Sequence, residues 1–476
     1  MRQQFSKLPR RVIGAIAIVA AVAIVLGTPA LVWAHARLTR SDPAAKATLS
    51  VAPTRIRLWF SEAPEIAMSR VTLTDSSGTP IPLGKVERGA EKLLIETSIG
   101  RALAAGRYTV TWHVAAADGH PSNGSFTFTV APHAAPASES SSSASRPGQS
   151  ARDSTSVMPM PMPPEQSIHV ESNDASGFAQ VAVRAMTFGS MLVVIGGIVF
   201  VLVILSRATG LSAETHETVR VNSARVVAIA AITLAISAAV RLTLQSRMMA
   251  GMMHEPAALT TVLNDTAWGR AWLAQVAATI VIGLAVMRGR STGAWVVAAC
   301  SAAVLAATPA LSGHAAAAAR WTALAIGADT LHVIAAAGWL GSLVFVVVVG
   351  MSTLMRSADE ARWSGIASLV EAFSPAALTF AAIVLVTGSV SAWLRLGSVP
   401  ALWSSGYGRT LLVKLALLAG AVGTGAYNWR RVRPSLGTEI ATTRLRRSAA
   451  AELAIGALVV IVTAVLVATP TPADLP

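Results

Sequence analysis

Three residues of this chain, His35, Asp118 and His120, have the side-chain types of a metal site. His35 follows an apolar segment typical of a cleavable export signal, and cleavage after Ala34 would make it the first residue of the mature chain. A first-residue histidine offers its α-amine and an imidazole nitrogen to the same ion. With the imidazole of His120 and the carboxylate of Asp118, the set has three nitrogens and one oxygen, which suits tetragonal Cu(II) better than zinc or magnesium. The sequence therefore predicts a Cu(II) site.

This ligand set depends on where the export signal ends. Residues 1–34 begin with basic side chains, continue with an apolar run over 12–26 and end in small residues, as signal peptides do. We expect cleavage after Ala34. Two alternatives stay open: cleavage after Ala36, which would delete His35, and retention of the whole segment as a membrane anchor.

Residues 35–130 have the alternating pattern of a small β domain. Apolar and polar residues alternate in five stretches, 55–61, 70–75, 93–97, 107–114 and 124–130. Strands of this length and spacing predict an all-β domain, an Ig-like or Greek-key sandwich. Asp118 and His120 fall in the turn before the last stretch and are two residues apart, so they can face the same way if the chain is extended there.

The second half of the chain has the composition of a membrane protein. Of the 476 residues, 53% are hydrophobic and only 13% are charged. Several apolar runs exceed the ~18 residues that suggest a transmembrane helix. The eight segments are 178–205, 224–245, 267–287, 293–311, 321–349, 372–394, 409–429 and 449–468. We therefore expect residues 178–470 to form an all-α bundle of about eight transmembrane helices, joined to the β domain by a Ser/Pro-rich linker over 131–177.

The arginines between these segments orient the bundle in the cytoplasmic membrane. Most of them lie in the first, third, fifth and seventh connections, which places those connections in the cytoplasm. The β domain and the C-terminus then lie on the outer side. The net charge of +14 is explained by this topology, so no nucleic-acid partner is expected.

Methionines at two places could carry copper onward, because thioethers favour Cu(I). The linker alternates methionine with proline, and the second apolar segment ends in a cluster of methionines and one histidine. These residues are Met158, Met160 and Met162 in the linker and Met248, Met249, Met252, Met253 and His254 in the cluster. For the linker the plainer interpretation, a proline-rich spacer, is favoured. For the cluster a copper-acceptor role is favoured over packing at the membrane surface.

Polar and sulfur-containing residues within the apolar segments outline a possible path across the membrane. The candidates are Met186, Met191, His314, Asp329 and His332. Asp329 and His332 are three residues apart, so they share one helix face. Ionisable groups are costly in a bilayer, and a functional role is the default expectation for them. The alternative for Asp329 is a structural ion pair with Lys414.

Five short motifs of the β domain give it a recognisable family character. They are His35-Ala36-Arg37-Leu38, Ser41-Asp42-Pro43-Ala44, Leu58-Trp59-Phe60-Ser61-Glu62, residues 106–112 and Asp118-Gly119-His120. The domain resembles the CopC family of periplasmic copper-binding proteins. The resemblance implies that His35, Asp118 and His120 bind Cu(II) and that Glu62 supports the ion or binds it weakly. The methionine-rich Cu(I) site of some members is reduced here to Met68, which favours a Cu(II)-only site.

The membrane segments carry a second set of motifs. They are Ser312-Gly313-His314-Ala315, Asp329-Thr330-Leu331-His332 and Gly338-Trp339-Leu340-Gly341, with weaker support from Phe373-Ser374-Pro375 and residues 407–414. This region resembles the CopD family of copper-resistance membrane proteins. The resemblance implies inward movement of copper across the cytoplasmic membrane in concert with CopC, here with both parts in one chain.

We therefore predict a copper-import protein rather than an enzyme, served by an unidentified extracytoplasmic copper donor or reductant. One alternative is copper sequestration or resistance without transport. A membrane haem redox protein is less favoured, because only His332 is clearly an intramembrane histidine. An exported oxidative copper enzyme is also less favoured, because Asp118 would fill the coordination position that oxygen needs.

The first prediction concerns the start of the mature chain. N-terminal sequencing of the purified mature protein should give a sequence that starts His35-Ala36-Arg37, because the predicted site needs the α-amine of His35. A mature chain that starts at Arg37, or one that retains residues 1–34, would contradict the predicted ligand set.

Overall fold

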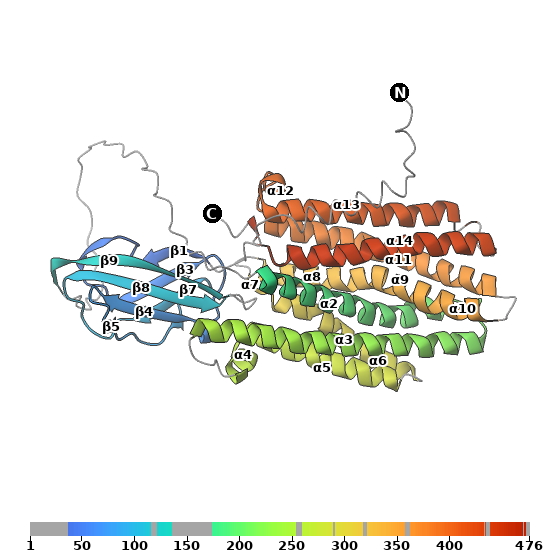
Figure 1. The fold of residues 1–476 in the computed structure, drawn as a ribbon, viewed down its shortest axis with the longest axis horizontal. Helices are drawn as coiled ribbons and strands as arrows, with labels where there is room; N and C mark the ends of the chain where they lie inside the picture. Colours follow the sequence, from blue (N-terminus) through green and yellow to red (C-terminus); the bar gives the residue numbers. More distant parts are fainter. Residues whose placement is uncertain are drawn as a thin grey trace, which may run out of the picture.

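The computed structural model describes residues 37–115, 121–135, 174–253, 259–288, 291–317, 321–357, 362–432, 434, 438–469 and 471–472. These residues form a β-sandwich that lies at one end of a bundle of long helices (Figure 1). The predicted fold class, an all-β sandwich followed by an all-α bundle with eight helices long and apolar enough to cross a membrane, is confirmed.

The sandwich consists of two sheets. The first has the strand order β1 (Leu38–Asp42), β3 (Arg55–Phe60), β7 (Leu94–Ser98) and β6 (Glu87–Arg88). The second has the order β2 (Thr48–Val51), β9 (Pro121–Ala135), β8 (Gly106–Ala115), β4 (Arg70–Asp75) and β5 (Pro80–Ile81). Strands β3, β4, β7, β8 and β9 are those that the alternation predicts, and the other four are short strands with weak patterns of their own.

Alternate residues of β3 and β8 build the core between the sheets. Ile56, Leu58 and Phe60 point inward from β3 and are almost fully buried. Phe60 meets Trp112 of β8 edge to face, with ring centroids 5.2 Å apart and planes at 76°. Burial of such a side chain contributes about 1.5–3 kcal/mol. These rings fix the sheets to each other close to the ends of both strands.

The long helices cross the bundle in alternating directions. They are α2 (Asp174–Val199), α3 (Ala213–Met253), α5 (Ala267–Met287), α6 (Thr292–Leu311), α8 (Thr322–Ala336), α11 (Arg362–Leu396), α13 (Gly406–Tyr427) and α14 (Glu439–Leu466). Among the described residues, three spans continue beyond their first α-helix. They continue with η2 (Phe200–Ile204) and η3 (Leu205–Arg207) after α2, with η4 (Ala337–Gly341), α9 (Ser342–Val344), η5 (Phe345–Met351) and α10 (Ser352–Arg356) after α8, and with η6 (Asn428–Val432) after α13. The remaining short elements are η1 (Ile66–Met68), α4 (Leu259–Asp265), α7 (His314–Ala317) and α12 (Ala401–Ser404).

The backbones of α2 and η4 touch at two glycines. A Cβ atom at Gly341 would lie 2.1 Å from the carbonyl oxygen of Leu192, and one at Gly196 would lie 2.3 Å from the carbonyl carbon of Gly341. Such close helix contacts are typical of membrane bundles, where small residues let backbones approach. One turn further, Phe200 stacks on Phe345 at 5.8 Å. These contacts hold the π-helical turn η4 against α2. They therefore set which side of the span that begins with α8 faces α2.

The sandwich is attached to the bundle by polar contacts. The Oε1 atom of Glu65 accepts a hydrogen bond of 2.8 Å from the backbone N–H of Ala267, the first residue of α5. The first N–H groups of a helix have no partner within the helix, so Glu65 acts as a cap supplied by the other part of the chain. Lys92 Nζ donates to the carbonyl oxygen of Ala316 in α7 at 3.0 Å. Partial burial lowers the pKa of Lys92 from its ordinary value, and the nearby Arg88 lowers it further.

An apolar cluster completes this contact. Met68 and Ala115 of the sandwich pack with Val262 and Trp268 of the bundle, and all four are buried. The sandwich therefore lies at the end where α3 ends and α5 begins, and the arginine-rich connections lie at the far end (Figure 1).

The second prediction tests the cap from Glu65. Replacing this residue with alanine should destabilise the start of α5 by about 0.5–2 kcal/mol, the usual cost of a lost cap. Amide hydrogen exchange of the full chain in lipid nanodiscs should then be faster over residues 267–270. The exposed carboxylate of β6 supplies the control, Glu87→Ala. Unchanged exchange in Glu65→Ala would show that the contact does not hold the helix end.

Candidate metal site and membrane-embedded polar cluster

The three predicted Cu(II) ligands, His35, Asp118 and His120, lie outside the described residues, but the residues that flank them are described. Ala115 at the end of β8 pairs with Pro121 at the start of β9, so 116–120 connect these two strands.

Backbone hydrogen bonds join the flanking segments at one end of the sandwich. Arg37 donates its N–H to Ser61 Oγ at 3.0 Å, and its carbonyl oxygen accepts from the Ser61 N–H at 2.8 Å. Glu65 donates its N–H to the carbonyl oxygen of Ala115 at 2.8 Å. One segment from Ser61 to Glu65 thus contacts both the residue two places after His35 and the residue three places before Asp118. The closeness of His35, Asp118 and His120 themselves stays a prediction.

Glu62 lies in this connecting segment and is only 5% exposed. Burial of a carboxylate is unfavourable unless polar or cationic groups offset it. The structure therefore places a buried carboxylate in the segment that hydrogen-bonds Arg37 and Ala115, and the supporting role expected for Glu62 stays a prediction.

The predicted methionine cluster lies at the helix end beside the sandwich. Residues 248–253 form the last turns of α3, and α3 packs near β9 and near Trp268. His314 begins α7, the element that Lys92 contacts. The side chains of 248–253 and of His314 lie outside the described part of the chain, as do His254 and the linker residues Met158, Met160 and Met162.

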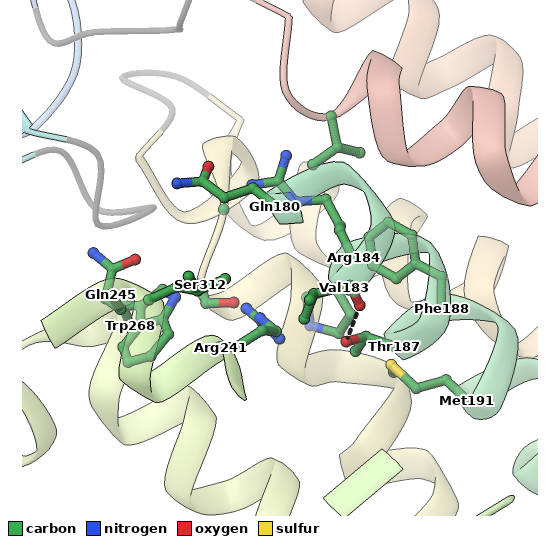
Figure 2. A pocket seen from close by; sticks show the side chains of 14 residues that line it. Gln180, Val183, Arg184, Thr187, Phe188, Met191, Arg241, Gln245, Trp268 and Ser312 are labelled. Carbon is green, nitrogen blue, oxygen red and sulfur yellow. Dashed lines mark hydrogen bonds between the residues drawn. The ribbon is translucent and has the colours of Figure 1, made fainter. Parts of the chain in front are cut away.

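A cavity of about 100 Å³ opens between α2, α3, α5 and α6, at the ends of these helices nearest the sandwich (Figure 2). Met191 lines it and is almost fully buried. Met186, five residues earlier, is 37% exposed and is not among the described lining residues. The structure therefore separates these two candidates, which the sequence suggested could share a cavity. The cavity also contains Arg184 and Arg241, whose charge repels a copper cation.

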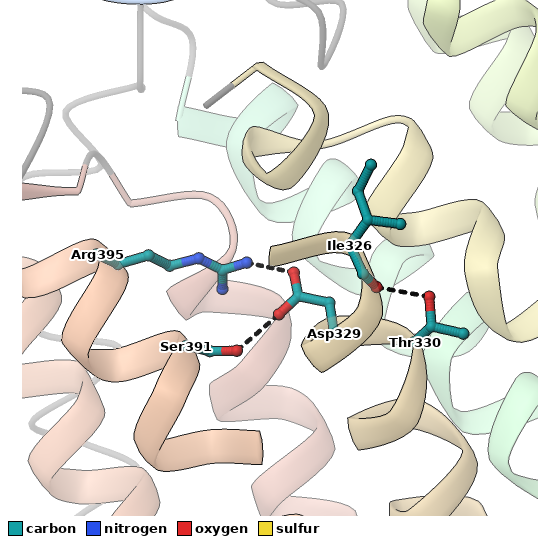
Figure 3. Close-up of polar contacts among 5 residues, drawn as sticks. All are labelled: Ile326, Asp329, Thr330, Ser391 and Arg395. Carbon is teal, nitrogen blue, oxygen red and sulfur yellow. Dashed lines mark hydrogen bonds and ion pairs between the residues drawn. The ribbon is translucent and has the colours of Figure 1, made fainter. Parts of the chain in front are cut away.

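Asp329 is held by α11 rather than by Lys414 (Figure 3). Its Oδ2 atom forms an ion pair with Arg395, and its Oδ1 atom accepts a hydrogen bond of 2.8 Å from Ser391 Oγ. Arg395 lies one residue beyond the apolar segment 372–394 expected from the sequence, but α11 extends to Leu396 and keeps the guanidinium against Asp329 of α8. The expected alternative, an ion pair of Asp329 with Lys414, is thus replaced by a pair with Arg395.

The polar cluster continues one turn along α8. His332 Nδ1 lies 3.0 Å from Thr387 Oγ1, and a Cβ atom at Gly388 would lie 3.3 Å from His332 Cε1, so α11 packs closely on this imidazole. Lys414 of α13 is near enough to interact electrostatically with both Asp329 and His332.

Tyr407 joins the cluster through a side-chain hydrogen bond with Arg395. The cluster thus contains one carboxylate and two basic side chains, Arg395 and Lys414, and the carboxylate is already engaged. In the described ranges, no group of three or more His, Cys, Asp or Glu side chains is arranged to hold a metal ion.

Another carboxylate, on α14, is buried inside the bundle. Glu452 of α14 is 4% exposed and accepts a hydrogen bond of 3.3 Å from Trp339 Nε1 in η4. Both residues line a larger cavity of about 290 Å³ that also reaches Asn428 and Arg430. Ten residues separate Asp329 from Trp339, about 15 Å along a helix and half of the ~30 Å hydrocarbon core. Spacing in the sequence did not reveal the partner of Glu452, because it lies on another helix.

Comparison with known families accounts for most of the chain. Residues 38–131 match the CopC domain, residues 173–324 match the copper resistance protein D-like N-terminal domain, and residues 367–466 match copper resistance protein D. The chain belongs to the CopC–CopD copper-resistance family and carries both parts in one polypeptide. It is a multi-pass membrane protein.

The chain is also similar to several individual proteins. The copper transport protein CutJ of Bacillus subtilis (strain 168) is 25% identical over 460 residues, which cover 94% of this chain and 76% of that protein. Protein YobA of Escherichia coli (strain K12) is 40% identical over 108 residues, or 22% of this chain and 85% of that protein. The crystal structure of CopC from Methylosinus trichosporium OB3b matches 21% of this chain and 96% of its own, with 31% identity and a TM-score of 0.20.

The third prediction concerns the ion pair of Asp329 with Arg395. Asp329→Asn should lower the free energy of unfolding by about 1–3 kcal/mol, less than the 3–5 kcal/mol of a fully buried pair, because the two side chains are 21% and 25% exposed. The double variant Asp329→Asn/Arg395→Gln should lose less than the two single variants together. Reversible denaturation in detergent micelles measures these values.

The control is Glu217→Gln, which breaks a surface pair with Arg220 and should cost under about 1 kcal/mol. If the double variant loses the full sum of the single losses, the two charges do not stabilise each other.

Proposed function

We propose that this protein captures copper on the outer side of the cytoplasmic membrane and passes it inward. The observation that carries the proposal is the docking of the sandwich on the bundle. Ala115, directly before the turn that carries Asp118 and His120, packs against Val262 and Trp268 at the outer end of the bundle. Copper is then cargo, and its donor site and first acceptor lie on neighbouring parts of one chain.

Capture uses His35, Asp118 and His120 as ligands of Cu(II), with Glu62 as the supporting carboxylate. The common end of the sandwich supports this assignment, because Arg37, Ser61 and Ala115 all lie there. The names of the relatives agree with it, since they include a copper transport protein and CopC proteins.

Transfer to the bundle follows by reduction and ligand exchange. One electron from an extracytoplasmic reductant converts Cu(II) to Cu(I), which thioethers bind better than the nitrogen and oxygen set does. The acceptors are Met248, Met249, Met252, Met253 and His254, on and after the end of α3. Attachment of the donor to the bundle raises its effective concentration there without requiring further contacts.

For the path across the membrane, Met191, His314 and His332 remain candidate copper ligands. Met191 would supply a soft thioether, and the two histidines would supply imidazoles of borderline softness. Asp329 takes a different role in this proposal, because Arg395 and Ser391 already occupy its oxygens. It offsets the guanidinium charge beside the path instead of binding copper. The arginine-rich connections at the far end of the bundle support a cytoplasmic location of that end, so copper that passes from the sandwich to the far end moves inward.

The fourth prediction is a transport measurement. Bacterial cells that express the full chain should accumulate mass-labelled copper several-fold faster than cells with an empty vector. The variant Asp118→Ala/His120→Ala should lose most of this gain, because two of the four predicted ligand atoms are removed. The control is His216→Ala, which removes an imidazole from the opposite end of α3.

Two results would contradict the proposal. Lower cellular copper on expression would show export. Unchanged cellular copper, with copper retained on the purified chain, would show sequestration without transport.

A further inference from the structure

The larger cavity, in the half of the bundle away from the sandwich, contains a buried carboxylate. Glu452 of α14 lines it together with Trp339 of η4, Ser374 of α11, and Asn428 and Arg430 of η6. We propose that Glu452 is a proton-binding site that exchanges its proton with the aqueous phase at that end of the bundle. The proposal concerns a second ligand and holds whether or not copper is imported.

The carboxylate lies deep in the bundle, where α13 passes it at Gly425. A Cβ atom at Gly425 would lie 3.7 Å from Glu452 Oε1 and 4.0 Å from Oε2. The span of α13 ends at Arg431, six residues after Gly425, which is about 9 Å at 1.5 Å per residue. Lys414 lies eleven residues before Gly425, about 16 Å away along the helix. An ionisable side chain at this depth is costly, and a functional role is its default expectation.

The described lining of the cavity fits a proton better than a metal ion. Its oxygen-bearing side chains are the carboxylate of Glu452, the hydroxyl of Ser374 and the amide of Asn428. Hard metal cations take several oxygen ligands, and the guanidinium of Arg430 opposes any added positive charge. Met351 supplies the one thioether of the described lining, which is a poor set for Cu(I). A proton needs a single carboxylate oxygen.

The cavity is large enough to bring water to this carboxylate. A water molecule needs roughly 10–15 Å³ of such volume, so a cavity of about 290 Å³ has room for several. Most of the wall is apolar, so waters gather at its polar groups, Ser374, Asn428 and Arg430. Asn428 and Arg430 lie at the end of their span. Water between them and Glu452 gives the proton a route to that end of the bundle.

Few other titratable groups face Glu452 in the described part of the chain. Arg430 is the one other charged side chain of the lining. Residues 185–206 of α2, η2 and η3 and residues 337–351 of η4, α9 and η5 contain no Asp, Glu, His, Lys or Arg. On α11, Glu371 is exposed and lies outside the lining. Arg430 is therefore the charge expected to influence proton binding most.

A bound proton acts on the π-helical turn η4. Trp339 Nε1 donates a hydrogen bond of 3.3 Å to Glu452 Oε1. An ionised carboxylate accepts a stronger hydrogen bond than the neutral acid, so protonation weakens this one. Leu340, the next residue, packs on α14, where a Cβ atom at Gly456 would lie 3.3 Å from Leu340 Cδ2. Protonation of Glu452 therefore loosens η4 from α14, in the span that also carries His332.

The fifth prediction is a pH titration of the full chain in lipid nanodiscs, followed by infrared difference spectroscopy. The carbonyl stretching band of protonated carboxylic acid should disappear as the pH rises, and it should shift in D₂O because the cavity admits water. Glu452→Gln should remove one component of this band, because the side chain no longer titrates. The control is Glu371→Gln, an exposed carboxylate outside the lining, which should keep that component.

Amide hydrogen exchange over residues 337–341 measures the effect on η4. After correction for the intrinsic pH dependence of exchange, lowering the pH through the titration of the band should speed exchange there several-fold in the wild-type chain. Glu452→Gln should exchange at every pH as the protonated wild-type chain does. Trp339→Phe should keep the titrating component and exchange fast at every pH, because its ring has no N–H group to donate.

Three results would overturn the proton site. They are a titrating band that is the same in Glu452→Gln and in the wild-type chain, a component that does not shift in D₂O, and pH-independent exchange over 337–341 in the wild-type chain. The last two need no variant to fold. Copper accumulation in cells decides the proposed function separately, because a chain that does not import copper can still bind this proton.

Discussion

Charge inside apolar helices is the constraint on which the arrangement of the bundle depends. Ionised side chains within a bilayer are costly and must face the interior of the bundle or each other. Arg395 meets this requirement through Asp329, a residue 66 positions away. The pair can form only if α8 turns the face that carries Asp329 toward α11 and α11 turns the face that carries Arg395 toward α8. It therefore constrains the rotation of each helix about its own axis. The hydrogen bond from Trp339 to Glu452 similarly joins η4 to α14.

The sequence predicts the elements well because their signals are local. Five strands follow from alternation, and the long helices follow from apolar runs. Strands β1, β2, β5 and β6 are missed because their pairing with neighbours, rather than their own pattern, makes them strands. The partner of Asp329 is missed for a related reason: the sequence shows that Lys414 and Arg395 exist, but not how far α11 extends or which face it turns to α8.

The contact between the sandwich and the bundle also could not be predicted from the sequence. In the sequence, nothing distinguishes Glu65 from other surface carboxylates. Its role is visible only in the folded chain, where it accepts a hydrogen bond from a backbone N–H group at the start of α5. Trp268 reads as an ordinary apolar residue of a membrane segment. In the folded chain it touches Met68 and Ala115 of the sandwich and also lines the cavity that holds Arg241. Docking of the sandwich and the shape of the cavity therefore depend on the same side chain.

The charge in the cavity that Trp268 lines affects any cation that moves past this end of the bundle. Two unit charges ~4 Å apart repel by about 4 kcal/mol at an effective dielectric constant of ~20, which lowers occupancy by about three orders of magnitude. A copper ion bound at Met191 would face the two arginines that line the same cavity. Soft ligands alone do not offset that repulsion. Either negative charge is present beside Met191 when copper arrives, or copper takes a route that avoids this cavity. The charge within the cavity, more than the number of sulfur ligands there, therefore determines which route copper can take.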